Sequence, residues 1–354
     1  MVKLNSDISN DFYEYISNDK FGKVYIILPN QKKGYNFGYS LFITNECQID
    51  TTLLVHCTNT GGCGVLDGKL DSSRRAIHLD DAYEAAKVSS LGGHLQYGFD
   101  LKIPVLTLLI PRFQGYYTHF LSSKVYNNDV FGLIQDNNER PEIDKLSDEE
   151  ILEIKELCKN LPEQVANMIK DSKDVLLKMG IHIDDKVIIE GYSAGSKFAN
   201  GFTVLYPELV KACICGGNSG IGVIPITHLN NQELNFPLGV ADLKNFNFEV
   251  FRSIPQYYYI GDNDDNDPAL YRDCYTTQEA ILINKLGPNV QDRFDKLKEI
   301  YNSYGINAIF QKFNGNHKNV GNPDGPAYMS VKKFIQYVIK QEINTNETIK
   351  QSMM

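Results

Sequence analysis

The sequence has no tract of basic residues. Its 354 residues include 35 Lys and Arg against 44 Asp and Glu, which gives a formal net charge of −9. Proteins that bind nucleic acids or anionic membrane surfaces carry clustered positive charge. The charge pattern therefore predicts neither a nucleic-acid partner nor a membrane partner.

Targeting segments and metal motifs are missing as well. The first residues, MVKLNSDISNDFYEY, contain no apolar stretch after a basic one, so they do not resemble a signal peptide. No apolar run approaches the ~18 residues that a membrane span needs. The seven cysteines are scattered and form no Cys-x-x-Cys, and no Cys/His spacing matches a zinc site. We therefore expect a cytoplasmic protein with reduced thiols and no metal, in which Cys213 and Cys215 are buried.

Short apolar or β-branched runs recur along the chain and predict strands. They cover residues 23–29, 39–44, 51–58, 103–111, 186–193, 211–217, 255–262 and 306–313. The first two are close in sequence, as an antiparallel pair would be. Several of the others are continuously apolar, which is typical of strands that are covered on both faces.

The segments between these strands have helical periodicity. Helices are predicted over residues 72–91, 147–180, 196–207 and 326–340. Pro162 should begin or kink the second half of the 147–180 helix. Strands that alternate with helices indicate the α/β class, with a mostly parallel central sheet and helices on both faces. We find no linker, so residues 1–354 are predicted to form a single domain.

Two long stretches, 112–147 and 219–250, do not follow this alternation. Both come after predicted strands and mix aromatic with polar residues. Long irregular insertions in a compact domain are usually functional or disordered, and these two are too aromatic for disorder. We therefore interpret them as cap insertions or pocket walls. Tyr116, Tyr117 and Phe120 are candidates for substrate binding, although core packing explains them equally well.

The segment IIEGYSAGSKF places Ser193 between a predicted strand and a predicted helix. Its pattern is Gly-x-Ser-x-Gly, with glycines at 191 and 195. This pattern is typical of the nucleophile elbow, a strained strand-to-helix turn that exposes the serine hydroxyl beside a helix N-terminus. Side chains at the two glycine positions would collide with the neighbouring strand and helix. Ser193 is therefore predicted to be a nucleophile.

A neutral serine needs a base, and in this architecture the chain order is serine, acid, histidine. After the predicted strand 255–262, only His317 remains of the seven histidines. It lies in a Gly/Asn loop just beyond the strand 306–313, where ligand chemistry occurs in open α/β sheets. For the acid, the segment YIGDNDDND offers Asp262, Asp264, Asp265 and Asp267.

From about residue 23 to residue 340, the chain resembles the α/β-hydrolase-fold serine hydrolases, in particular the esterases. In many members a strand ends in Gly-x-x-Asp, and that Asp orients the catalytic histidine. Gly261 and Asp264 match this pattern, so the resemblance selects Asp264, with Asp262 and Asp265 as alternatives. A calcium loop is a weaker reading of the same segment: its sixth position is Asp267 instead of glycine.

The resemblance also implies an oxyanion hole. One donor is the backbone N–H of Ala194, the residue after the nucleophile. The other should come from the loop after the third predicted strand, where many members carry His-Gly and this chain has His56-Cys57. The departure moves our expectation for the second donor to Thr58 or Asn59. His56 itself is expected to be a buried structural residue.

Together these residues predict a serine hydrolase that cleaves the carboxylic ester of a small acyl substrate, without a cofactor. A thioesterase, a peptidase or an acyltransferase on the same fold remains open. A protein that captures a ligand in a hydrolase-like pocket without turnover is a further alternative. The complete Ser, Asp and His set, in the expected order, favours the enzyme. The sequence does not indicate an oligomeric state.

Overall fold

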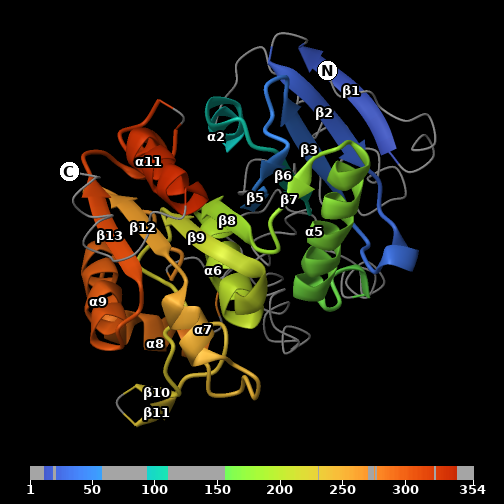
Figure 1. The fold of residues 1–354 in the computed structure, drawn as a ribbon. Helices are drawn as coiled ribbons and strands as arrows, with labels where there is room; N and C mark the ends of the chain where they lie inside the picture. Colours follow the sequence, from blue (N-terminus) through green and yellow to red (C-terminus); the bar gives the residue numbers. More distant parts are fainter. Residues whose placement is uncertain are drawn as a thin grey trace, which may run out of the picture.

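The computed structural model describes residues 12–18, 21–57, 94–110, 156–229, 231–269, 275, 277–322 and 324–340. Its centre is a nine-stranded sheet with the order β1-β2-β3-β6-β5-β8-β9-β12-β13 (Figure 1). The strands are β1 (Phe12–Asn18), β2 (Gly22–Ile27), β3 (Gly38–Thr44), β5 (Leu54–Cys57), β6 (Val105–Leu109), β8 (Val187–Tyr192), β9 (Val210–Gly216), β12 (Gln256–Gly261) and β13 (Ala308–Phe313).

The sheet is antiparallel at one edge and parallel elsewhere. β1, β2, β3 and β6 pair antiparallel in that order. From β6 through β5, β8, β9 and β12 to β13, each pair is parallel. The predicted mostly parallel sheet is therefore confirmed, and so is the antiparallel pairing of the first two predicted strands, which are β2 and β3.

Two parts of the strand prediction differ from the structure. β1 was not predicted at all. The run 51–58 is not one strand: Thr51 ends β4 (Asp50–Thr51), which pairs with β7 (His182–Ile183) in a separate two-stranded sheet. The chain joins the central sheet only at β5, where the N–H of Leu54 donates to the carbonyl of Pro104. A continuous apolar run does not reveal such a change of partner strand.

Helices cover both faces of the sheet, as predicted (Figure 1). Buried residues of α5 (Leu161–Lys178), α6 (Ala194–Leu205), α8 (Thr277–Leu286) and α9 (Val290–Ser303) belong to the core on one face. Residues of α2 (His94–Leu101) and α11 (Tyr328–Ile339) belong to the core on the other. Neighbouring residues of one strand serve opposite cores: Ile189 packs in the first and Ile188 in the second. The parallel strands are therefore largely apolar on both faces.

The predicted helix over 147–180 is α5 in its described part. Pro162 lies in the first turn of α5, which confirms that the proline begins this helix. Before it, Asn160 adopts a left-handed conformation with φ 51° and ends the turn at residues 158–160, which separates α5 from the helical residues 156–157. The predicted helix 72–91 and insertion 112–147 lie outside the described residues.

The insertion 219–250 is described except for residue 230. It contains the short pair β10 (His228–Leu229) and β11 (Gln232–Glu233) and leads into α7 (Phe248–Ser253). Much of it is buried in the core with α6 and α9, including Val223 and Phe236. The N–H of Val223 donates to Asn200 on α6, and its carbonyl accepts from Tyr301 on α9. That the insertion 219–250 lines a substrate pocket stays a prediction.

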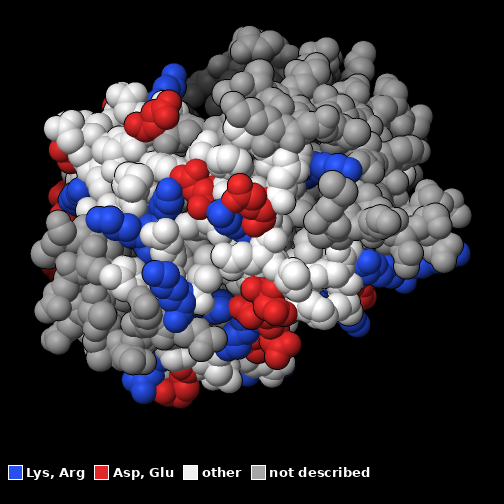
Figure 2. All heavy atoms as spheres, turned by 45° about the horizontal axis from the view of Figure 1, so that its top comes forward, with Lys and Arg blue, Asp and Glu red and all other residues white. Residues whose placement is uncertain are grey.

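Cysteines and surface charge complete the description. Cys213 and Cys215 are fully buried free thiols, as predicted, with their Sγ atoms 3.5 Å apart. Within the described ranges, no helix is both long and apolar enough to span a bilayer. On the face drawn in Figure 2, the described Lys and Arg residues lie interspersed with Asp and Glu.

Candidate active site

Ser193 occupies a sharp turn between β8 and α6. Its backbone has φ 56° and ψ −118°, a conformation that residues with a side chain rarely adopt. The turn is held because the N–H of Ser193 donates to the carbonyl of Gly216 at 2.8 Å on the neighbouring strand β9. Strain of this kind persists where the surrounding structure enforces it, commonly at functional sites. The geometry is that of the nucleophile elbow.

Gly191 is required by close packing inside this turn. A Cβ at this position would lie 2.2 Å from the carbonyl oxygen of Gly195 and 2.7 Å from the backbone nitrogen of Ser196. Both are backbone atoms of the first turn of α6, which cannot move aside without displacing the helix. The predicted collision is therefore confirmed for Gly191.

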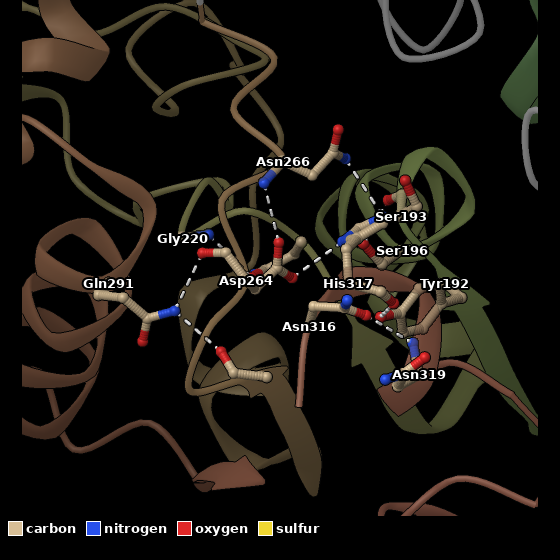
Figure 3. Close-up of polar contacts among 12 residues, drawn as sticks. Tyr192, Ser193, Ser196, Gly220, Asp264, Asn266, Gln291, Asn316, His317 and Asn319 are labelled. Carbon is tan, nitrogen blue, oxygen red and sulfur yellow. Dashed lines mark hydrogen bonds and ion pairs between the residues drawn. The ribbon is translucent and has the colours of Figure 1, made fainter. Parts of the chain in front are cut away.

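His317 and Asp264 meet on the loops after two neighbouring parallel strands. Asp264 follows β12, and His317 begins the short helix α10 (His317–Val320) after β13. The imidazole Nδ1 lies 2.9 Å from the Asp264 carboxylate oxygen Oδ2 (Figure 3). The Asp264 side chain is completely buried, and that of His317 is 17% exposed. The two loops touch, since a Cβ on Gly261 would lie 2.1 Å from the carbonyl oxygen of Gly315.

The other acids in this loop have different partners. Asp262 is exposed and accepts from the N–H of Gly315 at 2.9 Å. Asp265 is exposed, and Asp267 pairs with the buried Arg293 at 2.6 Å. These carboxylates therefore do not converge on one point, as a calcium loop requires. Among the residues that the structure describes, no group of three or more His, Cys, Asp or Glu could hold a metal ion.

Further contacts fix the acid loop and the histidine. Asp264 Oδ1 accepts the backbone N–H of Asn266 at 3.1 Å. From α9, the Gln291 amide donates to the carbonyls of Gly261 and Asp264 (Figure 3). The Tyr192 hydroxyl donates to the His317 carbonyl. Burial, and secondarily the charge of Asp264, raise the pKa of Tyr192, so this phenol stays a neutral donor.

The second imidazole nitrogen of His317 faces Asn266. The side-chain Nδ2 of Asn266 lies 3.2 Å from Nε2 of His317 (Figure 3). With Nδ1–H directed to the Asp264 carboxylate, Nε2 carries the lone pair and accepts from this amide. Ser193 follows Tyr192, whose ring centroid is 5.1 Å from that of His317, and Figure 3 shows Ser193 on the Nε2 side of the imidazole.

Sequence reasoning missed Asn266, Gln291 and Tyr192 as parts of this site. Asn266 is an amide between the aspartates of the acidic loop and matches no catalytic motif. Gln291 lies on a helix 27 residues beyond Asp264 and belongs to no motif. Tyr192 is a variable position of Gly-x-Ser-x-Gly, so the motif itself carries no information about its hydroxyl.

Of the predicted oxyanion donors, the structure describes Ala194 only. Ala194 is the first residue of α6, and the N–H groups of a first helical turn have no acceptor within the helix. Thr58 and Asn59 lie outside the described residues, which end at Cys57 of β5. Cys57 is opposite Gly191 in the parallel register, so the chain leaves β5 next to the elbow. Tyr116, Tyr117 and Phe120 also lie outside the described residues.

A cluster of buried polar side chains lies on the face of the sheet that α2 covers. His56 Nδ1 is 2.6 Å from Oε2 of Glu190, and the side chains are only 13% and 6% exposed. The imidazole of His94 stacks on that of His56 with centroids 3.6 Å apart, and its Nε2 lies 2.9 Å from the Thr107 hydroxyl. The structural role expected for His56 agrees with these contacts. Burial, and secondarily His56, lower the pKa of His94.

This lowered pKa predicts acid sensitivity. Below its ordinary pKa of 6.5, His94 takes up a proton in the unfolded chain but resists it in the fold. Stability is therefore full above about pH 6.5 and falls, by up to about 1.4 kcal/mol per pH unit, as the pH drops below it. Urea unfolding from pH 7 to pH 5 measures this. The unfolding free energy should depend less on pH in His94→Gln than in the wild type, and it should keep its pH dependence in the exposed His182→Gln. Equal pH dependence in all three proteins would contradict the prediction.

Solved structures with the same architecture include two hydrolases. The LpqC poly(3-hydroxybutyrate) depolymerase from Bordetella parapertussis matches with TM-score 0.51 and 12% identity, over 91% of this chain and 91% of its own. Poly(aspartic acid) hydrolase-1 from Sphingomonas sp. KT-1 matches with TM-score 0.50 and 14% identity, over 86% of this chain and 96% of its own. No protein-family model matches this chain, and no curated protein matches its sequence.

The order of the structural elements along the chain identifies the fold. The mostly parallel sheet, the elbow between β8 and α6, and the loops after β12 and β13 occur in this chain in the order that the resemblance implied. Together with the structural matches, they show that the chain has the α/β-hydrolase fold. At such low identities the matches establish the fold, and the chemistry has to be argued from the site.

Proposed function

We propose that this protein is a serine hydrolase that cleaves a carboxylic ester through an acyl-enzyme. Ser193 is the nucleophile, His317 the general base and acid, and Asp264 the residue that orients His317. The observation that carries the proposal is the combination of a strained serine elbow with a histidine whose Nδ1 lies 2.9 Å from a buried carboxylate. The two structural neighbours are a poly(3-hydroxybutyrate) depolymerase and a poly(aspartic acid) hydrolase, which supports a hydrolase on this fold.

The reaction proceeds in two steps. Ser193 Oγ attacks the acyl carbonyl while His317 Nε2 takes its proton, and the tetrahedral intermediate collapses as Nε2–H protonates the departing alcohol. Water then attacks the acyl-serine, with Nε2 again accepting a proton, and Ser193 is released with the carboxylic acid. The Asp264 carboxylate keeps the Nδ1 proton in place and stabilises the imidazolium. No cofactor enters either step.

Negative charge on the former carbonyl oxygen is stabilised at the start of α6. The N–H of Ala194 and the positive end of the α6 dipole provide this in the proposal, and a donor from residues 58–59 completes the hole. One such donor lowers the barrier by about 3 kcal/mol. The proposed substrate is a small acyl compound. Tyr116, Tyr117 and Phe120 are proposed to determine which acyl groups the enzyme accepts.

A fluorophosphonate probe tests the nucleophile directly. The probe should add once to the wild-type protein, because phosphorus reacts with an activated serine by the same attack that opens an ester. Ser193→Ala should take no label, and Ser172→Ala, which removes a buried hydroxyl of α5 that donates to the carbonyl of Ile169, should still be labelled. Intact mass spectrometry gives the result. A folded wild type that takes no label would contradict the proposal and favour a ligand-capturing protein.

A panel of esters, thioesters and peptides with a common acyl group then defines the reaction. We expect the ester to have the highest kcat/KM. Faster turnover of the thioester or the peptide would keep the Ser193 mechanism and replace the substrate class.

A further inference from the structure

We propose that Asn266 is a leaving-group residue: its side-chain amide rests on His317 Nε2 in the free enzyme and donates to the leaving-group oxygen of the bound ester. This inference rests on the proposed function of Ser193 and His317. It assigns to this site a preference for esters of poorly leaving alkyl alcohols.

Asn266 is tied to both members of the acid–base pair. Its backbone N–H donates to Asp264 Oδ1 at 3.1 Å, and its side-chain Nδ2 lies 3.2 Å from Nε2 of His317. Asp264 Oδ2 in turn holds Nδ1 of the same imidazole at 2.9 Å. The amide is therefore positioned by the same carboxylate that orients the histidine, and it moves with the catalytic pair.

The contact with Nε2 suits only the resting state. Neutral Nε2 accepts a hydrogen bond from the Asn266 amide. Nε2 has one lone pair, so the amide must leave it before the Ser193 hydroxyl can transfer its proton there, and the protonated Nε2 is itself a donor. The amide has to find another acceptor at this point of the reaction. The titratable groups that face His317 from the packed elements are Asp264 and Tyr192, and both are already engaged by other atoms of His317.

The nearest new acceptor is the leaving-group oxygen of the substrate. Nε2–H must approach this oxygen to protonate it, so the oxygen occupies the region that the Asn266 amide also faces. As the C–O bond breaks, the oxygen gains negative charge and becomes a better acceptor. The amide then stabilises the transition state more than the ground state, and its Nδ2 keeps its protons throughout.

The size of this stabilisation depends on the leaving group. An alkoxide is a strong base, so the departing oxygen of an alkyl ester carries much negative charge that hydrogen-bond donors stabilise. A 4-nitrophenolate disperses its charge into the ring and needs little help. The loss of one such hydrogen bond should therefore reduce turnover of the alkyl ester about tenfold and affect the nitrophenyl ester little.

The test compares ethyl and 4-nitrophenyl esters of one acyl chain. The measured quantity is kcat/KM, which reports acylation and therefore leaving-group departure. Asn266→Ala and the bulkier Asn266→Val should lower kcat/KM about tenfold for the ethyl ester and less than about threefold for the nitrophenyl ester. The control is Asn263→Ala, an exposed asparagine of the same loop whose amide contacts Asp262. It should leave the ratio of the two esters unchanged.

The other outcomes distinguish a failure of the Asn266 inference from a failure of the proposed serine hydrolase. An equal loss on both esters would show that Asn266 only supports the loop, and would overturn this inference while leaving the serine hydrolase intact. The absence of any loss of kcat/KM on either ester in both Asn266 variants would overturn it as well. A wild type that hydrolyses neither ester and takes no fluorophosphonate overturns the proposed function, and this inference with it.

Discussion

Asp264→Asn should lower kcat for ester hydrolysis by about four orders of magnitude. Oδ1 of residue 264 accepts the backbone N–H of Asn266, so an asparagine would keep its oxygen there and turn its NH2 group toward His317. That group would donate to Nδ1 and move the imidazole proton to Nε2. His317 could then no longer accept the proton of Ser193. Steady-state kinetics and the rate of fluorophosphonate labelling both measure the loss.

Asp265→Asn is the matched control, because it removes a neighbouring carboxylate that is exposed. It should retain activity close to wild type. Asp262 should not replace Asp264, since its carboxylate is held by the N–H of Gly315. Substantial activity in Asp264→Asn, together with its loss in Asp262→Asn, would show that the triad acid is misassigned.

Gly191→Ala should destabilise the protein severely, by about 3 kcal/mol or more. The new Cβ would lie 2.2 Å from the carbonyl oxygen and 2.3 Å from the carbonyl carbon of Gly195, far inside van der Waals contact. Neither the strand nor the first turn of α6 can move aside, because β8 lies between the two cores and the first turn of α6 is buried against it. The midpoint of urea unfolding measures the change, and any folded variant should also lose fluorophosphonate labelling at Ser193.

Gly180→Ala provides the comparison. Gly180 is exposed, a Cβ there would meet nothing within 4 Å, and its φ of 81° limits the expected cost to about 1 kcal/mol of backbone strain. The difference between the two variants therefore reports the collision at the elbow. Similar unfolding midpoints for both would show that the elbow has room for a side chain.

Much of the fold could be predicted because its strands are buried on two sides. β8 and β9 lie between helical layers, so their sequences are mostly apolar on both faces, with Glu190 and Lys211 as exceptions, and they stand out from the helical periodicity around them. The elbow was equally visible, since Gly-x-Ser-x-Gly is local and its glycine at 191 is forced by contacts four residues away. By contrast, β1 and the division of 51–58 between two sheets depend on partner strands that lie far away in the sequence.

The sequence by itself determined the α/β class, Ser193 and the order of serine, acid and histidine, because these depend on local spacing and chain order. The Gly-x-x-Asp resemblance selected Asp264 with Asp262 and Asp265 as alternatives, and only the tertiary structure shows that Asp264 is the carboxylate that faces His317. Asp262, Asp264 and Asp265 are chemically alike and almost adjacent, and what distinguishes them is the packing of the β12 loop against the β13 loop and Gln291 of α9. The same packing brings Asn266 to Nε2, a contact across 51 residues that no spacing rule predicts.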